Sequence, residues 1–141
     1  LPRGARTGTG ELVTLLRHAF AEVERLHPEA LATLGDLSLR GGGEAPAHGS
    51  HESGRDVDIF FYGVDIEGRP FRPSRAGLRF GPNGWARAWA PLRGVTGAPG
   101  PVPHVRFDVV RNWALVHALL SDGSAEVQWI FIHRALGELL L

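Results

Sequence analysis

Apolar residues recur at helical spacing in two stretches of the chain. Between residues 9 and 27 they repeat every three or four positions, which predicts an amphipathic helix that ends before Pro28. A second helix is predicted to begin after Asp108, because aspartate is a common N-terminal cap. The apolar stripe of this second helix is predicted to consist of Trp113, Val116 and Leu120. A third helix is predicted to start at Arg134 and to run to Leu141.

Three other stretches have the apolar and β-branched character of β-strands: 31–39, 57–62 and 126–132. In the last, alternation places Val127, Trp129 and Phe131 on one face and Gln128, Ile130 and Ile132 on the other. The predicted order is helix, strand, strand, long loop, helix, strand and helix. This order favours the α+β class for a single domain over residues 1–141.

The stretch 68–103 shows neither pattern and is rich in arginine, glycine and proline. It is long for a loop within a domain, which indicates either a function or a lack of fixed structure. Trp85 and Trp89 stand among its arginines. This combination suits a groove for sugar or peptide stacking, and it also suits nucleic-acid binding. A third interpretation is a surface insertion whose tryptophans fold onto the core, and the sequence leaves all three open.

Composition argues against several classes of function. The 141 residues carry 15 cationic and 15 acidic side chains, so bulk charge gives no reason to expect binding to nucleic acid or to an anionic membrane. Cysteine is absent, which excludes disulfides and thiolate metal sites. No apolar run approaches the length of a membrane span, and no signal-peptide pattern opens the chain.

Two histidines and two aspartates lie close together just before the second predicted strand: His48, His51, Asp56 and Asp58. The two aspartates share one face of an extended chain, and Gly54 would let the backbone turn so that His51 reaches Asp58. Imidazole and carboxylate together form a ligand set that suits zinc. The same residue types also make hydrogen-bonded caps and turns in solvated loops. The spacing alone therefore leaves a metal site and a purely structural loop open.

The run His48-x-x-His51-x-x-Gly54-x-Asp56-Val57-Asp58-Ile59 resembles the first zinc motif of the penicillin-insensitive murein endopeptidases. These enzymes are zinc metallopeptidases, in the wider group that includes lysostaphin-type enzymes and D-alanyl-D-alanine carboxypeptidases. The likeness touches most of the chain. Its further segments are Gly35-Asp36-Leu37-Ser38, Gly41-Gly42-Gly43, Arg106-Phe107-Asp108, Arg111-Asn112-Trp113-Ala114-Leu115 and Gln128-Trp129-Ile130-Phe131-Ile132.

The resemblance implies a zinc (Zn2+) site with His51 and Asp58 as ligands and His48 as a further metal position. Asp56 would orient a ligand imidazole from behind, as such carboxylates commonly do. The implied fold is a small, mainly antiparallel sheet with flanking helices. The implied activity is zinc-dependent hydrolysis of peptide cross-links in bacterial peptidoglycan, in the periplasm or cell envelope. Trp85 and Trp89 would then line the substrate groove.

One part of the family pattern is missing from this chain. The family takes its third zinc ligand and its general base from a His-x-His motif near the end of the domain, and no such motif follows Asp58. We therefore expect the chain to be a fragment, truncated at both ends, with the general base beyond Leu141. Two ligands are too few for a catalytic zinc ion. The alternative function is a non-catalytic peptidoglycan-binding pseudoenzyme, and nucleic-acid binding through the arginine- and tryptophan-containing loop is a third hypothesis.

Overall fold

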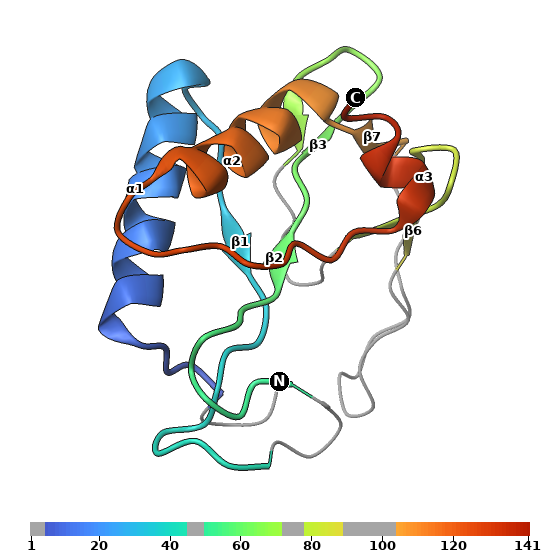
Figure 1. Ribbon diagram of the computed structural model, residues 1–141. Helices are drawn as coiled ribbons and strands as arrows, with labels where there is room; N and C mark the ends of the chain where they lie inside the picture. Colours follow the sequence, from blue (N-terminus) through green and yellow to red (C-terminus); the bar gives the residue numbers. More distant parts are fainter. Residues whose placement is uncertain (1–4, 45–49, 72–77, 89–103) are drawn as a thin grey trace.

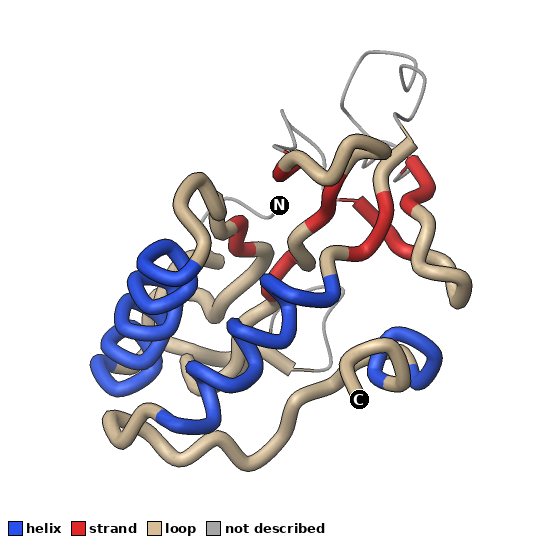
Figure 2. The backbone as a smooth tube through the Cα atoms, turned by 90° about the horizontal axis from the view of Figure 1, so that it is seen from above, coloured by secondary structure: helices blue, strands red, loops and turns tan. Residues whose placement is uncertain are grey.

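The computed structural model describes residues 5–44, 50–71, 78–88 and 104–141. Two helices, α1 (Gly10–Leu26) and α2 (Val109–Ser121), pack against each other and lie side by side in both views (Figures 1 and 2). A third, short helix, α3 (Arg134–Gly137), follows near the end of the chain. Together with small antiparallel sheets, these helices confirm the α+β class.

The described strands are short, and every pairing between them is antiparallel. They form three small sheets, whereas the resemblance implies a single small sheet. The first sheet pairs β1 (Thr33–Leu34) with β2 (Ile59–Phe60). The second has the order β4 (Pro70–Phe71), β3 (Gly63–Val64), β7 (Arg106–Phe107), and the third pairs β5 (Leu78–Phe80) with β6 (Ala86–Ala88).

Helix α1 agrees with its prediction. The side chain of Thr9 caps it by accepting a hydrogen bond from the N–H of Leu12 at 3.3 Å, and Glu11 lies in the first turn, where a carboxylate favours the helix dipole. The face turned to the protein interior consists of Leu12, Leu15, Leu16, Ala19 and Val23. None of the described helices is long and apolar enough to cross a bilayer.

Helix α2 begins where the sequence predicts, but its buried face is a different one. Asp108 caps it by accepting from the N–H of Arg111 at 3.1 Å. The buried side chains are Asn112, Leu115, Ala118 and Leu119. The predicted stripe of Trp113, Val116 and Leu120 instead faces away from the core, and two of its three side chains are exposed. Both faces of this helix are apolar enough that periodicity alone does not select between them.

The buried amide of Asn112 joins α2 to the strands. Its Oδ1 accepts from the N–H of Tyr62 at 2.9 Å, and its Nδ2 donates to the carbonyl of Tyr62 at 2.9 Å and to that of Asp108 at 2.8 Å. An unpaired buried polar group would cost about 1–3 kcal/mol. These three bonds leave the amide satisfied. They also hold Tyr62, the residue before β3, against the first turn of α2.

A second, aromatic cluster connects two of the sheets. Phe107 of β7 meets Phe61 with ring centroids 5.1 Å apart and Phe80 of β5 at 5.6 Å, both edge to face. Aromatic pairs prefer this geometry because the positive ring edge meets a negative ring face. The cluster therefore holds the sheet of β5 and β6 against the sheet of β3 and β7.

Five predicted elements differ from the structure. Strand 31–39 is reduced to the two residues of β1, and strand 57–62 to those of β2. The stretch 126–132 belongs to no helix or strand among the described residues. The predicted loop 68–103 contains β4, β5 and β6, while its parts 72–77 and 89–103 lie outside the described residues. The third helix ends at Gly137 instead of reaching Leu141.

Candidate metal-binding site

His51 lies in the loop that leads into β2, and its side chain is almost completely buried, with 2 % of the residue exposed. Its backbone has a φ of +67°, a left-handed conformation that is rare for residues other than glycine. The carboxylate of Asp56 stabilises this turn, because its Oδ2 accepts the N–H of His51 at 2.6 Å. Backbone strain of this kind persists only where the surroundings enforce it, and it is common at functional sites.

The imidazole of His51 lies between two carboxylates. Its Nδ1 is 2.8 Å from Oδ2 of Asp56, and its Nε2 is 3.4 Å from Oδ2 of Asp58. The first distance is that of a direct polar contact, whereas the second exceeds the usual range for an N–H···O hydrogen bond. Two ligand atoms bound to one tetrahedral zinc ion lie roughly 3.4 Å apart, given metal–ligand bonds of about 2.0–2.2 Å. The separation between His51 and Asp58 therefore fits a shared metal ion.

The position of Asp58 depends on a close approach of two backbones. The N–H of Gly35 donates to the carbonyl of Asp58 at 2.7 Å, and the N–H of Asp58 donates to the carbonyl of Asp36 at 2.9 Å. These bonds extend the antiparallel pairing of β1 and β2. A Cβ atom on Gly35 would lie 2.8 Å from the Cβ of Asp58, which is closer than such atoms come. Glycine at position 35 is thus required for Asp58 to occupy its place.

The other side of the loop is attached to the N-terminus of α1. Gly54, with a φ of +74°, donates its N–H to Oγ of Ser38 at 2.7 Å and accepts the N–H of Thr9 at 2.8 Å. Ser38 is buried, with 1 % exposed. The first helix, the β1 region and the histidine loop are therefore connected through one glycine.

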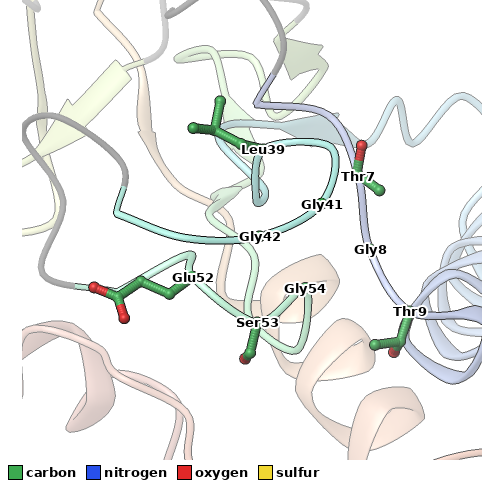
Figure 3. A pocket seen from close by; sticks show the side chains of 9 residues that line it. All are labelled: Thr7, Gly8, Thr9, Leu39, Gly41, Gly42, Glu52, Ser53 and Gly54. Carbon is green, nitrogen blue, oxygen red and sulfur yellow. The ribbon is translucent and has the colours of Figure 1, made fainter.

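A shallow hollow of about 330 Å³ lies beside this loop (Figure 3). The triple-glycine turn borders it, and Gly43 donates its N–H to the carbonyl of Glu52 at 3.0 Å. A Cβ on Gly42 would lie 2.5 Å from that same carbonyl oxygen. Figure 3 shows the glycine turn running alongside the stretch 52–54 and the segment 7–9. The triple-glycine turn therefore lies beside the histidine motif.

The remaining predicted site residues lie elsewhere or outside the described chain. His48 and Trp89 are not among the described residues. Trp85 forms an isolated antiparallel β-bridge with Arg106 and is 43 % exposed. Its ring lies edge to face with that of His104, with the centroids 6.4 Å apart.

The described residues bring two candidate metal ligands together, His51 and Asp58. Among the residues that the structure describes, no group of three or more histidine, cysteine, aspartate or glutamate side chains converges to hold an ion. The side chain of Asp58 is 58 % exposed, so the space next to Nε2 of His51 opens toward solvent. Sequence reasoning did not identify Gly35 and Ser38 as the groups that position this pair. Both residues lie in the run 35–38, one of the segments in which the sequence resembles the murein endopeptidases. That resemblance was the sequence signal that could have pointed to them.

Comparisons with known proteins add no assignment. No family model, no curated protein and no solved structure matches the chain.

Proposed function

We propose that the protein is a zinc-dependent hydrolase of peptide cross-links in bacterial peptidoglycan, with His51 and Asp58 as zinc ligands. The observation that carries the proposal is the 3.4 Å separation between Nε2 of His51 and Oδ2 of Asp58. It is supported by the contact of Asp56 with the other ring nitrogen, since metal-ligating histidines commonly have a carboxylate on their second nitrogen. The substrate class, and a location in the periplasm or cell envelope, come from the sequence resemblance.

Each residue of the loop has a role in this proposal. Asp56 accepts the backbone N–H of His51 and lies 2.8 Å from Nδ1 of its ring, while Nε2 is the ring nitrogen that lies near Asp58. Burial of His51 keeps its ring in one orientation, while the exposed carboxylate of Asp58 leaves the site open to substrate. Bound zinc would supply a Lewis acid for the peptide carbonyl and would lower the pKa of water at neutral pH.

A catalytic zinc ion needs a third protein ligand. His48, three positions before His51, is the candidate within this chain, and it lies outside the described residues. By the resemblance, a further ligand and the general base would come from a His-x-His motif, which does not follow Asp58 in this sequence. The proposal therefore assigns two ligands to described residues and derives the base from the family pattern alone.

Zinc binding tests the ligand assignment. Equilibrium dialysis followed by metal analysis should find zinc bound to the unmodified protein. His51→Ala and Asp58→Asn should each lower zinc retention by about tenfold or more, because each removes one of the few ligands. His18→Ala is the matched control, since His18 is an exposed histidine paired with Asp122 at 2.9 Å. Equal zinc retention by all three variants would show the ligand assignment to be wrong.

Hydrolysis is tested separately from binding. By the resemblance, turnover also needs a His-x-His motif, so purified peptidoglycan incubated with a zinc-loaded form of the protein that includes this motif should release uncross-linked muropeptides, measured by liquid chromatography. The alternative, a peptidoglycan-binding module without turnover, is favoured by the presence of only two converging ligands among the described residues. In that case the protein would co-sediment with peptidoglycan and release no muropeptide.

A further inference from the structure

Residues 104–107, which include β7, have one face in the protein interior and one face in solvent. Val105 and Phe107 are buried, whereas His104 and Arg106, which alternate with them, are exposed. Successive side chains of an extended chain point to opposite faces, so His104 and Arg106 share the solvent face. Figure 1 shows β6 and β7 on the side of the molecule away from α1.

Trp85 lies on the same solvent face. It forms an antiparallel bridge with Arg106, and next to this bridge the N–H of Phe107 donates to the carbonyl of Gly84 at 2.7 Å. Residues directly opposite each other in an antiparallel pair have side chains on one face. The indole is 43 % exposed, and the ring of His104 meets it edge to face with the centroids 6.4 Å apart.

The neighbouring strand β5 adds a third basic residue to this face. Phe80 lies opposite Ala86 in the register of β5 and β6, and it packs on the interior side against Phe107. Arg79 and Trp85, one position before Phe80 and Ala86, therefore both point to the solvent side. Arg79 is exposed. We refer to four residues together as the Trp85 face: Arg79, Trp85, His104 and Arg106.

The positive charge of the Trp85 face has no carboxylate beside it in the strands. Strands β3 to β7 contain no acidic residue. Asp65 and Asp108, which follow β3 and β7, are each paired with an arginine outside this face. Within the described part of the chain, Arg106 and His104 form no ion pair. A surface of this kind attracts anions.

We propose that the Trp85 face binds the glycan–peptide strands of peptidoglycan, independently of zinc. The indole of Trp85 offers a flat apolar surface for the apolar side of a sugar ring. Carboxylates of the peptide stems would pair with Arg79 and Arg106, since guanidinium groups match carboxylate geometry. The substrate class rests on the proposed function. The resemblance assigns Trp85 alone to a groove, and the structure adds the basic residues around it.

An anionic glycan peptide fits the Trp85 face better than single-stranded nucleic acid does. Non-specific binding of nucleic acid uses a positive groove that follows the backbone, with aromatic side chains for successive bases. Among the described residues, the Trp85 face has one tryptophan and two arginines. The 15 cationic side chains of the chain are also balanced by 15 acidic ones, so no strong attraction to a phosphate backbone is expected.

Titration with a soluble disaccharide-peptide fragment of peptidoglycan, in the presence of a metal chelator, tests the proposal. Calorimetry should show binding that Trp85→Ala and Arg106→Gln each weaken by about fivefold or more, because tryptophan and arginine commonly dominate binding surfaces. Trp85→Phe keeps an aromatic ring and should retain most of the affinity. Trp129→Ala and Arg17→Gln are matched controls, since both side chains are exposed elsewhere and should leave the affinity unchanged. The absence of binding, or equal affinity of all variants, overturns the proposal.

Two further arms identify the ligand chemistry. Amidation of the carboxylates of the fragment should weaken binding, and so should a rise in NaCl from about 0.05 to 0.5 M, because salt screens exposed charges. A single-stranded DNA oligonucleotide is the competing ligand. If DNA bound more tightly than the fragment and lost affinity in Trp85→Ala and Arg106→Gln, the face would be a nucleic-acid site and the proposal would be wrong.

Asp58→Asn separates this proposal from zinc-dependent hydrolysis. The variant should bind the fragment as the unmodified protein does, because Asp58 is not part of the Trp85 face. Weakened binding in Arg106→Gln with no zinc bound by the unmodified protein would leave the Trp85 face intact and refute the zinc site. Zinc retention and hydrolysis that do not depend on Trp85 or Arg106, with fragment affinity equally unaffected, would refute the Trp85 face alone.

Discussion

The helix pair and the histidine loop are stabilised in different ways. The interface of α1 and α2 is a cluster of leucine, alanine and valine side chains with few polar groups. The loop 51–58 contains a buried imidazole and two carboxylates. Its backbone at Asp58 also lies in close contact with Gly35 of another segment. Apolar burial is non-directional and scales with area, whereas the loop depends on particular atoms at particular distances. The first region should therefore determine stability and the second should determine metal binding.

A cavity in the helix pair should have the largest effect on stability. Leu16 is 4 % exposed and belongs to the core cluster. Leu16→Ala should lower the free energy of unfolding by about 2–5 kcal/mol, because it removes buried surface and leaves a cavity. Urea denaturation at pH 7 measures the change.

The control for this variant lies on the same helix. Val13 is 42 % exposed, and Val13→Ala should change the free energy of unfolding by less than about 0.5 kcal/mol. The folded fraction of Leu16→Ala should retain zinc as the unmodified protein does. A loss of zinc by that folded fraction would show that the two regions are not separable.

A methyl group at Gly35 should weaken zinc binding, which the cavity at Leu16 should leave unchanged. Gly35→Ala places a Cβ 2.8 Å from the Cβ of Asp58, so the two backbones must separate. We expect a loss of about 1–3 kcal/mol in stability, which is typical of overpacking, together with weakened zinc binding, because Asp58 moves away from His51.

Gly10→Ala is the matched control, since a Cβ at Gly10 meets nothing within 4 Å. Comparison of zinc titrations of the two glycine variants gives the result. If Gly35→Ala bound zinc as tightly as Gly10→Ala, the close approach would have no role in positioning the ligand.

The smallest effect is expected at Tyr62, the polar member of the apolar cluster. Burial raises the pKa of its hydroxyl from 10.0 to about 12, with Asp108 adding to the rise and Arg111 opposing it. Between pH 10 and 12 the unfolded chain loses this proton while the folded chain keeps it, so stability is present below pH 10 and is lost as pH rises through this window.

The sequence makes this titration easy to isolate. The chain has one tyrosine, no cysteine and no lysine, so Tyr62 is the side chain that titrates in this range. Its hydroxyl makes no hydrogen bond to another described residue, so Tyr62→Phe should alter stability at pH 7 by less than about 1 kcal/mol. The variant should also lack the alkaline loss of stability, measured by denaturation from pH 8 to 12. An identical alkaline profile in Tyr62→Phe would assign that loss to another group.

Much of the helical structure could be predicted from local sequence. The cap at Thr9, the apolar period of α1 and the cap at Asp108 each depend on neighbouring residues only, and the structure has all three. The proximity of His51 and Asp58 also followed from the motif, because Gly54 permits the turn between them. The buried face of α2 was predicted wrongly, because its choice depends on what packs against the helix.

The strands show most clearly where local information ends. The pattern of 126–132 is that of a good strand, yet no described segment pairs with it. The loop 68–103 lacks that pattern, yet it contributes β4, β5 and β6. A strand exists only where a second segment supplies hydrogen bonds, and that partner is distant in sequence.

The sequence by itself determined the two long helices, the α+β class and the residues of the candidate site, since caps, periodicity and a short motif are local properties. Only the tertiary structure decided which face of α2 is buried, which strands pair, and that Gly35 holds Asp58 within 3.4 Å of His51. Those outcomes depend on contacts between segments far apart along the chain, whose geometry no local pattern specifies.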